Sequence, residues 1–338
     1  MPILNPFETN NAFNLISLSE ALNIIPNTYG RIRNSGLFRD KPVRSRTIMI
    51  EKKNNTLNLL KTLPPGSPGQ KNKMGLRNAR AFIIPHIPVD DVILPEEYDG
   101  LRAFGSESQL ETLANLMNEH LENIRAKFAI TEEYQKMGAL KGIVYDSDGT
   151  AIYNYFQEFT VKQEVVDFLL GTASTDILAK CVAVKRIVED NLQGETMTSI
   201  RVEVDSSFWD KFISHTLVKA AYDRWREGAA LREDLRDGFE FGGLIFREYR
   251  GTATDFDGTA RPFLDTDEGI AYPLGTQNVF KDFICPADFL ETINTLGKRL
   301  YAKQEARKFN RGIDIHTQSN TLPMCMRPSL IVKIHTSN

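Results

Sequence analysis

The chain has 338 residues, of which 41% are hydrophobic and 25% are charged, which is ordinary for a globular protein and excludes a mainly disordered one. This length predicts about two domains. No run of about 18 apolar residues occurs, so no transmembrane helix is expected, and no secretory signal is expected because the first basic residue is Arg31. The cysteines lack a CxxC pattern and indicate neither a disulfide framework nor a zinc cluster, which favours synthesis in a reducing cytoplasm; they are Cys181, Cys285 and Cys325.

Charge is unevenly spread along the chain. Residues 31–80 hold thirteen Lys and Arg but only two acidic residues, so this segment is near +11 although the whole chain is at −3. Residues 1–30 contribute −2, which leaves about −12 for residues 81–338. A basic segment beside an acidic remainder predicts docking on an acidic partner, either nucleic acid or another copy of the acidic part. The alternative is a solvated, flexible basic segment.

The first elements in chain order are short and extended. Two strand-like runs, 47–50 and 56–60, flank a turn signal at 53–55. Residues 64–69 hold three prolines and two glycines, which exclude a helix or a central strand and predict an exposed loop tip. Residues 81–88 then follow as extended apolar chain. This stretch has too few large apolar residues for a core of its own, so we expect it to lie on another surface.

The clearest predicted helix runs from about residue 107 to 136. Ser106 with Gln109, or Ser108 with Glu111, supplies a capping box at its start. Apolar residues at spacings of three and four share one face, namely Leu110, Leu113, Met117, Leu121, Ile124 and Phe128. At about 1.5 Å per residue the helix would be about 45 Å long, which suggests a spine on which other elements lie.

The remaining elements mix helix and strand. Residues 141–160 predict a strand, an Asp/Gly turn and a second strand. Further helices are expected over 164–192, from Ser206 or Ser207 through Trp225, and, weakened by Gly297, over 287–308. Further strands are expected over 200–204, 244–246, 269–272 and 330–334. The order has no regular βα repeat, so it predicts an α+β fold rather than a doubly wound sheet.

The motif Asp146-Ser147-Asp148-Gly149-Thr150 suggests a chemical function. After an apolar strand, DxDGT is a signature of haloacid-dehalogenase-like phosphatases, whose first Asp is the nucleophile and second an acid/base near Mg²⁺. That site needs a loop leading into a helix, yet residues 151–156 have a strand pattern, and no downstream Lys or acidic pair is recognisable. A second copy at 255–259 lies in a polar loop, where Asp and Gly are simply good turn residues. Neither copy has the start of an EF-hand loop.

No other pattern predicts an active site. The histidines form no HExxH and no Cys pair at ligand spacing; they are His86, His120, His215, His316 and His335. His86 lies between two prolines and is expected to be structural, and Trp209 and Trp225 are expected to pack on a helix. Neither GxxxxGK[ST] nor GxSxG occurs. The sequence therefore predicts no catalytic residue, no cofactor-binding residue and no metal site.

Several stretches occur in the order typical of one family. They are Arg80–Pro88 with Asp91 and Ile93, Gly100–Gly105, Gly138–Gly149, Gln318–Asn320 and Arg327-Pro328. Together they resemble the phage major capsid protein E family, the lambda-like major capsid proteins. The DxDGT motif is part of that family's own pattern, which removes most of the weight from the phosphatase alternative.

This resemblance implies the α+β capsid fold named after phage Hong Kong ninety-seven. The N-terminal arm would be 1–40, and the E-loop 41–85 with its tip near 64–69. The peripheral domain would be 86–160 with 311–338 and would contain a spine helix at 106–137, and the axial domain would be 161–310. No long N-terminal coiled coil is visible that could act as a built-in scaffold.

The resemblance further implies a structural protein and not an enzyme: the major head protein of a tailed bacteriophage. Copies would self-assemble into hexamers and pentamers of an icosahedral shell around double-stranded DNA. The expected partners are neighbouring copies, a separate scaffold, portal and decoration proteins, and the packaged DNA non-specifically, with no membrane. The expected location is the virion, after assembly in the host cytoplasm.

The basic segment leaves two uses open within that function. It can lie on the acidic bodies of neighbouring subunits, or its part 31–44 can face packaged DNA. Two alternatives from other classes remain: a Mg²⁺-dependent phosphatase using Asp146 and Asp148, and a monomeric DNA-binding module using 31–80, which would bind with a steep salt dependence.

Overall fold

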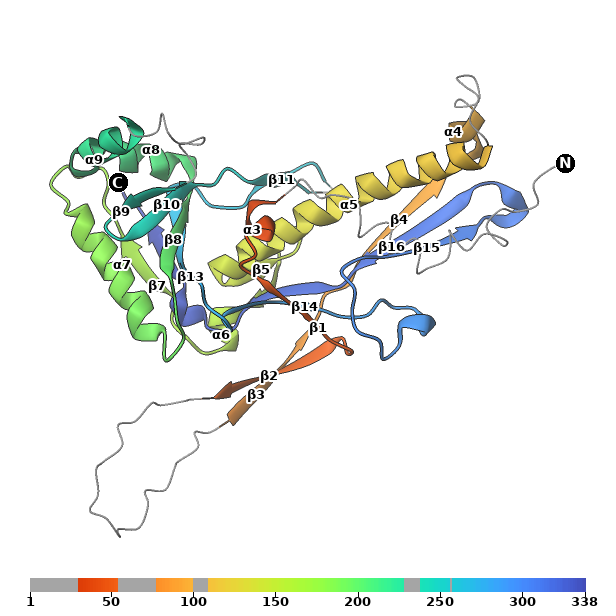
Figure 1. Cartoon of the computed structure of the whole chain (residues 1–338), viewed down its shortest axis with the longest axis horizontal. Helices are drawn as coiled ribbons and strands as arrows, with labels where there is room; N and C mark the ends of the chain where they lie inside the picture. The colour runs from red at the N-terminus through yellow and green to blue at the C-terminus, as the bar shows by residue number, and fades with distance from the viewer. Residues whose placement is uncertain (1–29, 54–76, 100–108, 228–237, 256) are drawn as a thin grey trace, which may run out of the picture. The chain divides into compact units, whose positions relative to one another are not determined.

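The computed structural model describes residues 30–53, 77–99, 109–227, 238–255 and 257–338 (Figure 1). These fall into two compact units. The first takes in the described residues within 1–48, 82–133 and 282–323, and the second those within 49–81, 134–281 and 324–338. Helices and strands follow one another without a regular alternation, so the predicted α+β class is confirmed.

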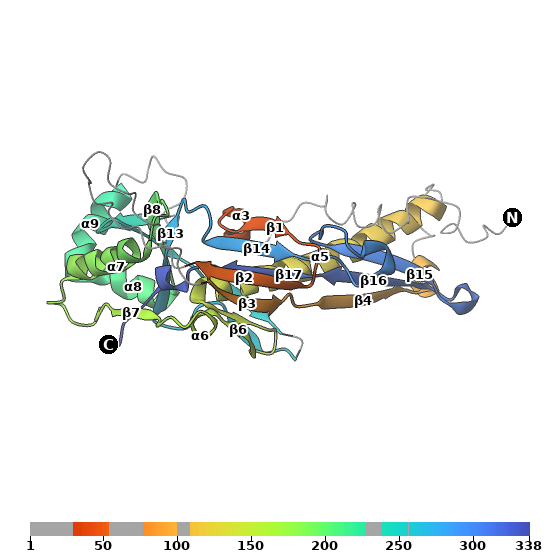
Figure 2. The same ribbon diagram turned by 90° about the horizontal axis from the view of Figure 1, so that it is seen from below.

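The first unit is built on a long helix and an antiparallel sheet. Helix α5 (Gln109–Lys141) has 33 residues, and its first part runs along the sheet formed by β15 (Tyr301–Ala306), β16 (Ile313–Ser319) and β4 (Ile87–Ile93) (Figures 1 and 2). Apolar residues of both elements form one buried cluster, namely Ile93, Leu116, Met117, Leu121, Ile124, Phe128, Leu300, Ala302, Ile313 and Ile315. Burial of this apolar stripe stabilises the helix more than its local propensity does.

Smaller elements complete this part of the chain. They are helix α3 (Arg31–Asn34), helix α4 (Pro95–Asp99) and a sheet in the order β1 (Arg39–Pro42), β14 (Phe280–Ile284), β17 (Thr321–Cys325). Strands β2 (Thr47–Lys53) and β3 (Arg77–Ile83) form a separate two-stranded sheet.

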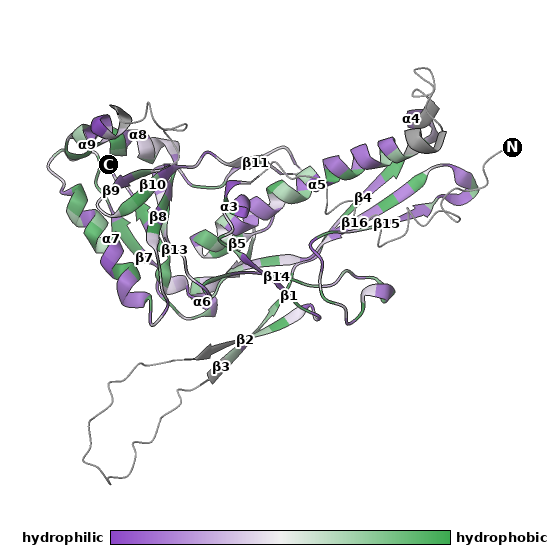
Figure 3. Cartoon of the chain, viewed as in Figure 1, coloured by the Kyte–Doolittle hydropathy of each residue, from purple (hydrophilic) through white to green (hydrophobic). Residues whose placement is uncertain are grey.

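The second unit contains a six-stranded mixed sheet. Its order is β7 (Glu164–Asp167), β18 (Val332–His335), β13 (Glu268–Leu274), β8 (Ser199–Val204), β10 (Leu244–Glu248), β9 (Phe239–Phe241). The pairs β7–β18 and β8–β10 are parallel and the others antiparallel. Helices α7 (Ile177–Asn191), α8 (Ser206–Ser214) and α9 (Thr216–Glu227) accompany it. In Figure 3 the strands of this sheet and α7 both carry hydrophobic and hydrophilic residues.

Aromatic rings fill the core between α8 and this sheet. Phe212 on α8 stacks on Phe246 of β10 with 4.2 Å between ring centroids, and Phe168 meets Phe208 edge to face at 5.6 Å. Two hairpins lie elsewhere in the same unit: β5 (Ile143–Tyr145) with β6 (Ala151–Asn154), and β11 (Thr252–Thr254) with β12 (Ala260–Pro262). Helix α6 (Tyr155–Glu158) and three 3-10 turns, Leu290–Thr292, Lys308–Asn310 and Pro328–Leu330, complete the elements.

Most of the predicted elements are confirmed, and the helix is longer than expected. Helix α5 continues past residue 136 to Lys141, because its last turns are buried and Gly142, at φ +81°, ends it. The hairpin at 141–160 and the strands near 200, 244, 269 and 332 are present. Residues 56–60, the tip at 64–69 and the caps Ser106 and Ser108 lie outside the described residues.

Three helix predictions need correction. Residues 164–167 form strand β7, because they pair with β18, and helix begins only at Ile177, where the Asp176 carboxylate accepts from Ala179 N at 3.0 Å. The helix expected through Trp225 is two helices, because His215 is extended (φ −61°, ψ 133°). Asp205, rather than Ser206 or Ser207, caps the first of them by accepting from Ser207 N at 3.0 Å.

The helix expected over 287–308 is wrong for a tertiary reason. Residues 301–306 form β15 and pair with β16, so that Leu300 and Ala302 reach the buried cluster of the first unit. Gly297 lies so close to Ile284 that an added Cβ would stand 2.3 Å from the Ile284 carbonyl oxygen. No helix in the described part of the chain is both long and apolar enough to span a bilayer.

Candidate functional site

The start of the described chain is fastened to helix α5. One carboxylate, that of Glu133, accepts hydrogen bonds from Ile32 N at 2.7 Å and Arg33 N at 2.9 Å. The Ile32 side chain is buried, and Arg33 Nε lies 3.1 Å from a Glu132 carboxylate oxygen. These contacts satisfy the backbone donors at the start of α3 and fix the point where the predicted arm meets the first unit.

A buried arginine ties four segments of the first unit together. The Arg299 guanidinium bonds to Asp282 at 3.0 Å, to Asp40 at 2.6 Å and to Glu132. The side chain of Arg299 is 16% exposed and that of Asp282 0%. Burial by itself would lower the pKa of Arg299, but the three carboxylates raise it above its ordinary value. The cation therefore stays charged and neutralises acids that could not be buried alone.

We call the two-stranded sheet of β2 and β3 the stem. Its foot, where Arg46 precedes β2 and Ile84 follows β3, is fixed by two reciprocal hydrogen bonds. Ile84 N donates to Arg46 O at 2.9 Å, and Arg46 Nε donates back to Ile84 O at 3.3 Å. The buried side of the stem consists of Ile48, Ile50 and Phe82. Its other side leaves large apolar side chains in water, with Met49 65% and Ile83 57% exposed.

The structure divides the basic residues of 31–80 into two groups. Arg33 and Arg46 have the partners given above, Lys41 lies 5.3 Å from the Phe283 ring centre, and Arg80 pairs with Glu158 at 2.8 Å. Arg39 and Arg44 are exposed and have no hydrogen bond or ion pair with any described residue. The side chains of Lys52, Lys53, Lys61, Lys71, Lys73 and Arg77 lie outside the description.

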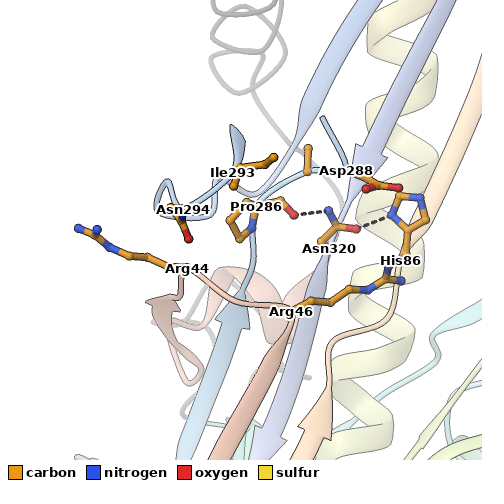
Figure 4. A pocket seen from close by; sticks show the side chains of 9 residues that line it. Arg44, Arg46, His86, Pro286, Asp288, Ile293, Asn294 and Asn320 are labelled. Carbon is orange, nitrogen blue, oxygen red and sulfur yellow. Dashed lines mark hydrogen bonds between the residues drawn. The ribbon is translucent and has the colours of Figure 1, made fainter. Parts of the chain in front are cut away.

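A pocket of about 230 Å³ opens beside the stem foot (Figure 4). Its lining includes three basic side chains, Arg44, Arg46 and His86, and otherwise consists of Pro286, Ala287, Asp288, Ile293, Asn294 and Asn320. His86 Nδ1 lies 2.8 Å from Asn320 Oδ1, and Asn320 Nδ2 donates to Pro286 O at 3.0 Å. The predicted structural role of His86 fits this bonding.

The two DxDGT copies form the same hairpin turn. In the first, Asp146 N donates to Thr150 O at 2.8 Å and Gly149 N to Asp146 O at 3.0 Å. In the second, Asp255 N donates to Thr259 O at 3.0 Å and Gly258 N to Asp255 O at 3.1 Å. The turns connect β5 to β6 and β11 to β12, so both copies join strands rather than lead into a helix.

The Arg261 side chain joins the two turns by hydrogen bonds to both. Its NH2 group donates to Asp148 O at 2.8 Å, and its Nε lies 3.1 Å from an Asp255 carboxylate oxygen. Gly149 is needed beside it, because a Cβ there would stand 2.8 Å from the guanidinium. Hydrogen bonds from Thr150 lower the pKa of Asp148 below its ordinary value, and the backbone bond from Thr259, with Arg261, lowers that of Asp255.

This geometry does not support the phosphatase. The Asp148 carboxylate is engaged by Thr150 N at 2.8 Å and by Thr150 Oγ1 at 2.6 Å, and the chain continues into a strand. Among the described residues no group of three His, Cys, Asp or Glu side chains could hold a metal ion. The motif therefore has a structural explanation, which its sequence alone did not reveal because the Arg261 bond to Asp148 spans 113 residues.

The histidine, cysteine and tryptophan residues considered next also have structural roles. His120 lies 2.7 Å from Asp91 and 3.1 Å from Glu97; burial opposes protonation, but these carboxylates raise the pKa of the imidazole. All three cysteines are free and buried, and burial raises their pKa to about 12 at Cys181, about 11 at Cys285 and about 12 at Cys325. Trp209 is a buried residue of α8. Trp225 stacks on Tyr222 of α9 with 5.6 Å between ring centroids.

Comparison with known proteins agrees with the arrangement of elements. The major capsid protein of Pseudomonas phage KPP10 is 30% identical over 340 residues, covering 96% of this chain and 97% of that protein. The major capsid protein of Salmonella phage Felix O1 (isolate Felix O1-VT1) is 31% identical over 353 residues, covering 95% and 96%. A crystal structure described as a prophage capsid protein from E. coli CFT073 has a TM-score of 0.56 at 14% identity, covering 96% of this chain and 99% of that one.

The predicted capsid fold of the Hong Kong ninety-seven type is therefore confirmed. The family model described as phage major capsid protein E matches residues 14–336, nearly the whole chain. Neither the phosphatase nor the DNA-binding module receives support from these relatives. The chain belongs to the phage major capsid protein E family, and its function is that of a major protein of the phage head.

Proposed function

We propose that copies of this chain form the hexameric and pentameric capsomers of an icosahedral shell around double-stranded DNA. In this proposal 1–40 is the N-terminal arm, 41–85 the E-loop, 86–160 with 311–338 the peripheral domain, and 161–310 the axial domain. A separate scaffold acts in assembly in the host cytoplasm, and portal and decoration proteins complete the head of a tailed phage.

The observation that carries this proposal is the exposed apolar side of the β2–β3 stem. A two-stranded sheet is marginally stable alone, and Met49 and Ile83 stand on it in water. Such residues on an extended, two-stranded element suit a contact with a neighbouring copy, which would bury them at about 25 cal/mol per Å² of apolar surface.

Charge supports the same use of the stem. The segment 31–80 is near +11 and residues 81–338 near −12, so the stem of one copy and the body of the next attract each other. Within the described chain part of this positive charge is neutralised internally, for example at Arg33 and Arg80. The contact should weaken with salt where it is exposed.

The test reverses charge in the predicted E-loop. The fourfold variant Lys52, Lys53, Lys61 and Lys71→Glu should give fewer shells or none, by negative-stain electron microscopy and sedimentation. A matched control makes the same change in net charge at exposed positions elsewhere: Lys162, Lys185, Lys219 and Arg250→Glu. Normal shells from the first variant, or equal loss in both, would refute a specific role of the E-loop charge.

Packaged DNA is proposed as a non-specific partner of residues 31–44. Arg33 is paired with Glu132 and cannot serve, whereas Arg39 is exposed on β1. Arg39→Glu should reduce DNA retention in shells of unchanged geometry, and its difference from the unaltered chain should shrink as salt rises. Full retention in such shells would remove Arg39 from the DNA contact.

A further inference from the structure

The pocket beside the stem foot is built before any partner arrives. The bonds between Arg46 and Ile84 fix its basic wall, and the chain of bonds from His86 through Asn320 to Pro286 fixes its floor. Because the Asn320 amide nitrogen donates to Pro286 O, its oxygen must accept from His86 Nδ1. His86 Nε2 therefore remains for another contact.

The side chains divide the pocket into an interior and a mouth. Figure 4 shows Arg46 reaching toward His86, while Arg44 extends outward on the opposite side. Arg46 has one Nε bond to Ile84 O, and Arg44 has no hydrogen bond or ion pair within the described ranges. Both arginines line the pocket, Arg46 toward its interior and Arg44 at its mouth, and the acidic residue of the lining is Asp288.

The opposite wall is an ordered segment that turns apolar side chains outward. Gly297 N donates to Val43 O at 3.0 Å, Asp288 N to Gln318 Oε1 at 2.9 Å, and Thr292 Oγ1 to Ala287 O at 2.6 Å. The large apolar residues of this segment are nevertheless in water, with Leu290 88%, Ile293 61% and Leu296 55% exposed. A cluster of large exposed apolar residues on a bonded segment is typical of a surface that another protein covers.

We propose that this pocket and its apolar wall form a docking surface for a second copy of the chain, in which an Asp or Glu carboxylate pairs with Arg44 at the mouth. This inference rests on the proposed function, since it names one surface by which copies meet. A guanidinium binds a carboxylate through parallel N–H bonds. The acidic residues come from residues 81–338 of the other copy, which carry about −12.

A protein carboxylate fits this surface better than a DNA phosphate does. Leu290, Ile293 and Leu296 lie on the same segment as the pocket wall, and DNA-binding surfaces are polar and strongly positive. Asp288 also places a negative charge in the pocket, which opposes a polyanion more than it opposes a single carboxylate at Arg44.

Zero-length cross-linking tests the contact directly. The variant Arg44→Lys keeps the charge and supplies an amine that a carbodiimide joins to a touching carboxylate. Shells are assembled from equal parts of ¹⁵N-labelled and unlabelled full-length chain, so that mixed-isotope peptides identify links between copies. The expected result is a mixed-isotope link from position 44 to an Asp or Glu within 81–338. Arg186→Lys, exposed on α7 outside this pocket, is the control and should give at least tenfold less of it.

The outcomes separate this inference from the proposed function. Shells that form normally but show no mixed-isotope link at position 44, or equal links at 186 and 44, overturn the docking surface and leave the shell protein intact. If position 44 is shielded only in DNA-filled shells, and empty shells give no links there, the pocket contacts DNA. That outcome also overturns the docking surface.

A charge reversal gives the functional counterpart. Arg44→Glu should raise the concentration needed for assembly by about tenfold, because it places a carboxylate against a carboxylate. The fold of the unassembled variant is checked by circular dichroism, and Arg186→Glu, at an exposed position of α7, is the matched control. An unchanged assembly concentration for Arg44→Glu would contradict the inference.

Discussion

Two arginines hold segments together in this chain, one with a side chain 16% exposed and one with a side chain 34% exposed. Arg299 joins Asp40, Glu132 and Asp282 inside the first unit, whereas Arg261 joins the two DxDGT turns in the second. Arg299 faces two buried carboxylates, Asp282 at 0% and Glu132 at 8% exposed, whereas Arg261 faces one, Asp255 at 5%. We therefore expect the number of buried carboxylates left without a cation, rather than the number of bonds, to decide how much each arginine stabilises.

The largest expected effect comes from removing the buried cation. Arg299→Ala should lower the free energy of unfolding by about 3–5 kcal/mol, because Asp282 and Glu132 would stay buried without it. Urea unfolding of the unassembled chain measures this. The control Arg307→Ala removes an exposed pair with Asp314 at 2.7 Å and should cost about 0–1 kcal/mol. Equal losses in the two variants would break the distinction between buried and exposed pairs.

A smaller effect separates the two turns. Gly149 and Gly258 have nearly the same φ, +86° and +85°, but a Cβ at 149 meets Arg261 at 2.8 Å while one at 258 meets nothing within 4 Å. Both Ala variants should lose about 1–2 kcal/mol to backbone strain. Gly149→Ala should lose about 0.5–1.5 kcal/mol more in unfolding measurements, because it displaces Arg261 from Asp148 O.

The extra loss should depend on the arginine. In an Arg261→Ala background, Gly149→Ala and Gly258→Ala should become equally costly, since no guanidinium remains to be displaced. If Gly149→Ala still lost more stability than Gly258→Ala in that background, the bond from Arg261 to Asp148 O would not be the cause of the difference.

The smallest expected effect is a pH dependence at the second turn. The pKa of Asp255 is lowered in the folded chain, so its contribution to stability is present above pH 3.8 and is lost as pH falls through the folded pKa. Asp255→Asn keeps an acceptor for Asp257 N and Thr259 N but cannot titrate. The midpoint temperature of thermal unfolding should therefore fall less steeply below about pH 4 in this variant than in the unaltered chain. Parallel curves would argue against this contribution.

Sequence patterns predicted what local chemistry decides. The spacing of Met117, Leu121, Ile124 and Phe128 identified the long helix, and the Asp/Gly turn identified the first hairpin, as the structure confirms. The helix expected at 287–308 failed because pairing of β15 with β16 outweighs local propensity. The family followed from short ordered stretches rather than from any active-site pattern.

Polar contacts between residues far apart in the chain left no pattern in the sequence from which they could be predicted. Glu133 and Ile32 are 101 residues apart, and Arg299 and Asp40 are 259 apart, so no spacing links them. The basic segment was recognised from its charge, but which arginines are paired and which are exposed depends on where Glu132, Glu158 and Ile84 are brought by the fold.

The buried cysteines have a consequence for labelling chemistry. With pKa values raised to about 11 or 12, at pH 7 only about one thiol in ten thousand or fewer is a thiolate, the form that attacks maleimides and disulfides. A single new surface thiol, for example from Arg44→Cys, should therefore react far faster than Cys181, Cys285 or Cys325. Fluorophores can then be attached at a chosen position of a folded subunit without first replacing any native cysteine.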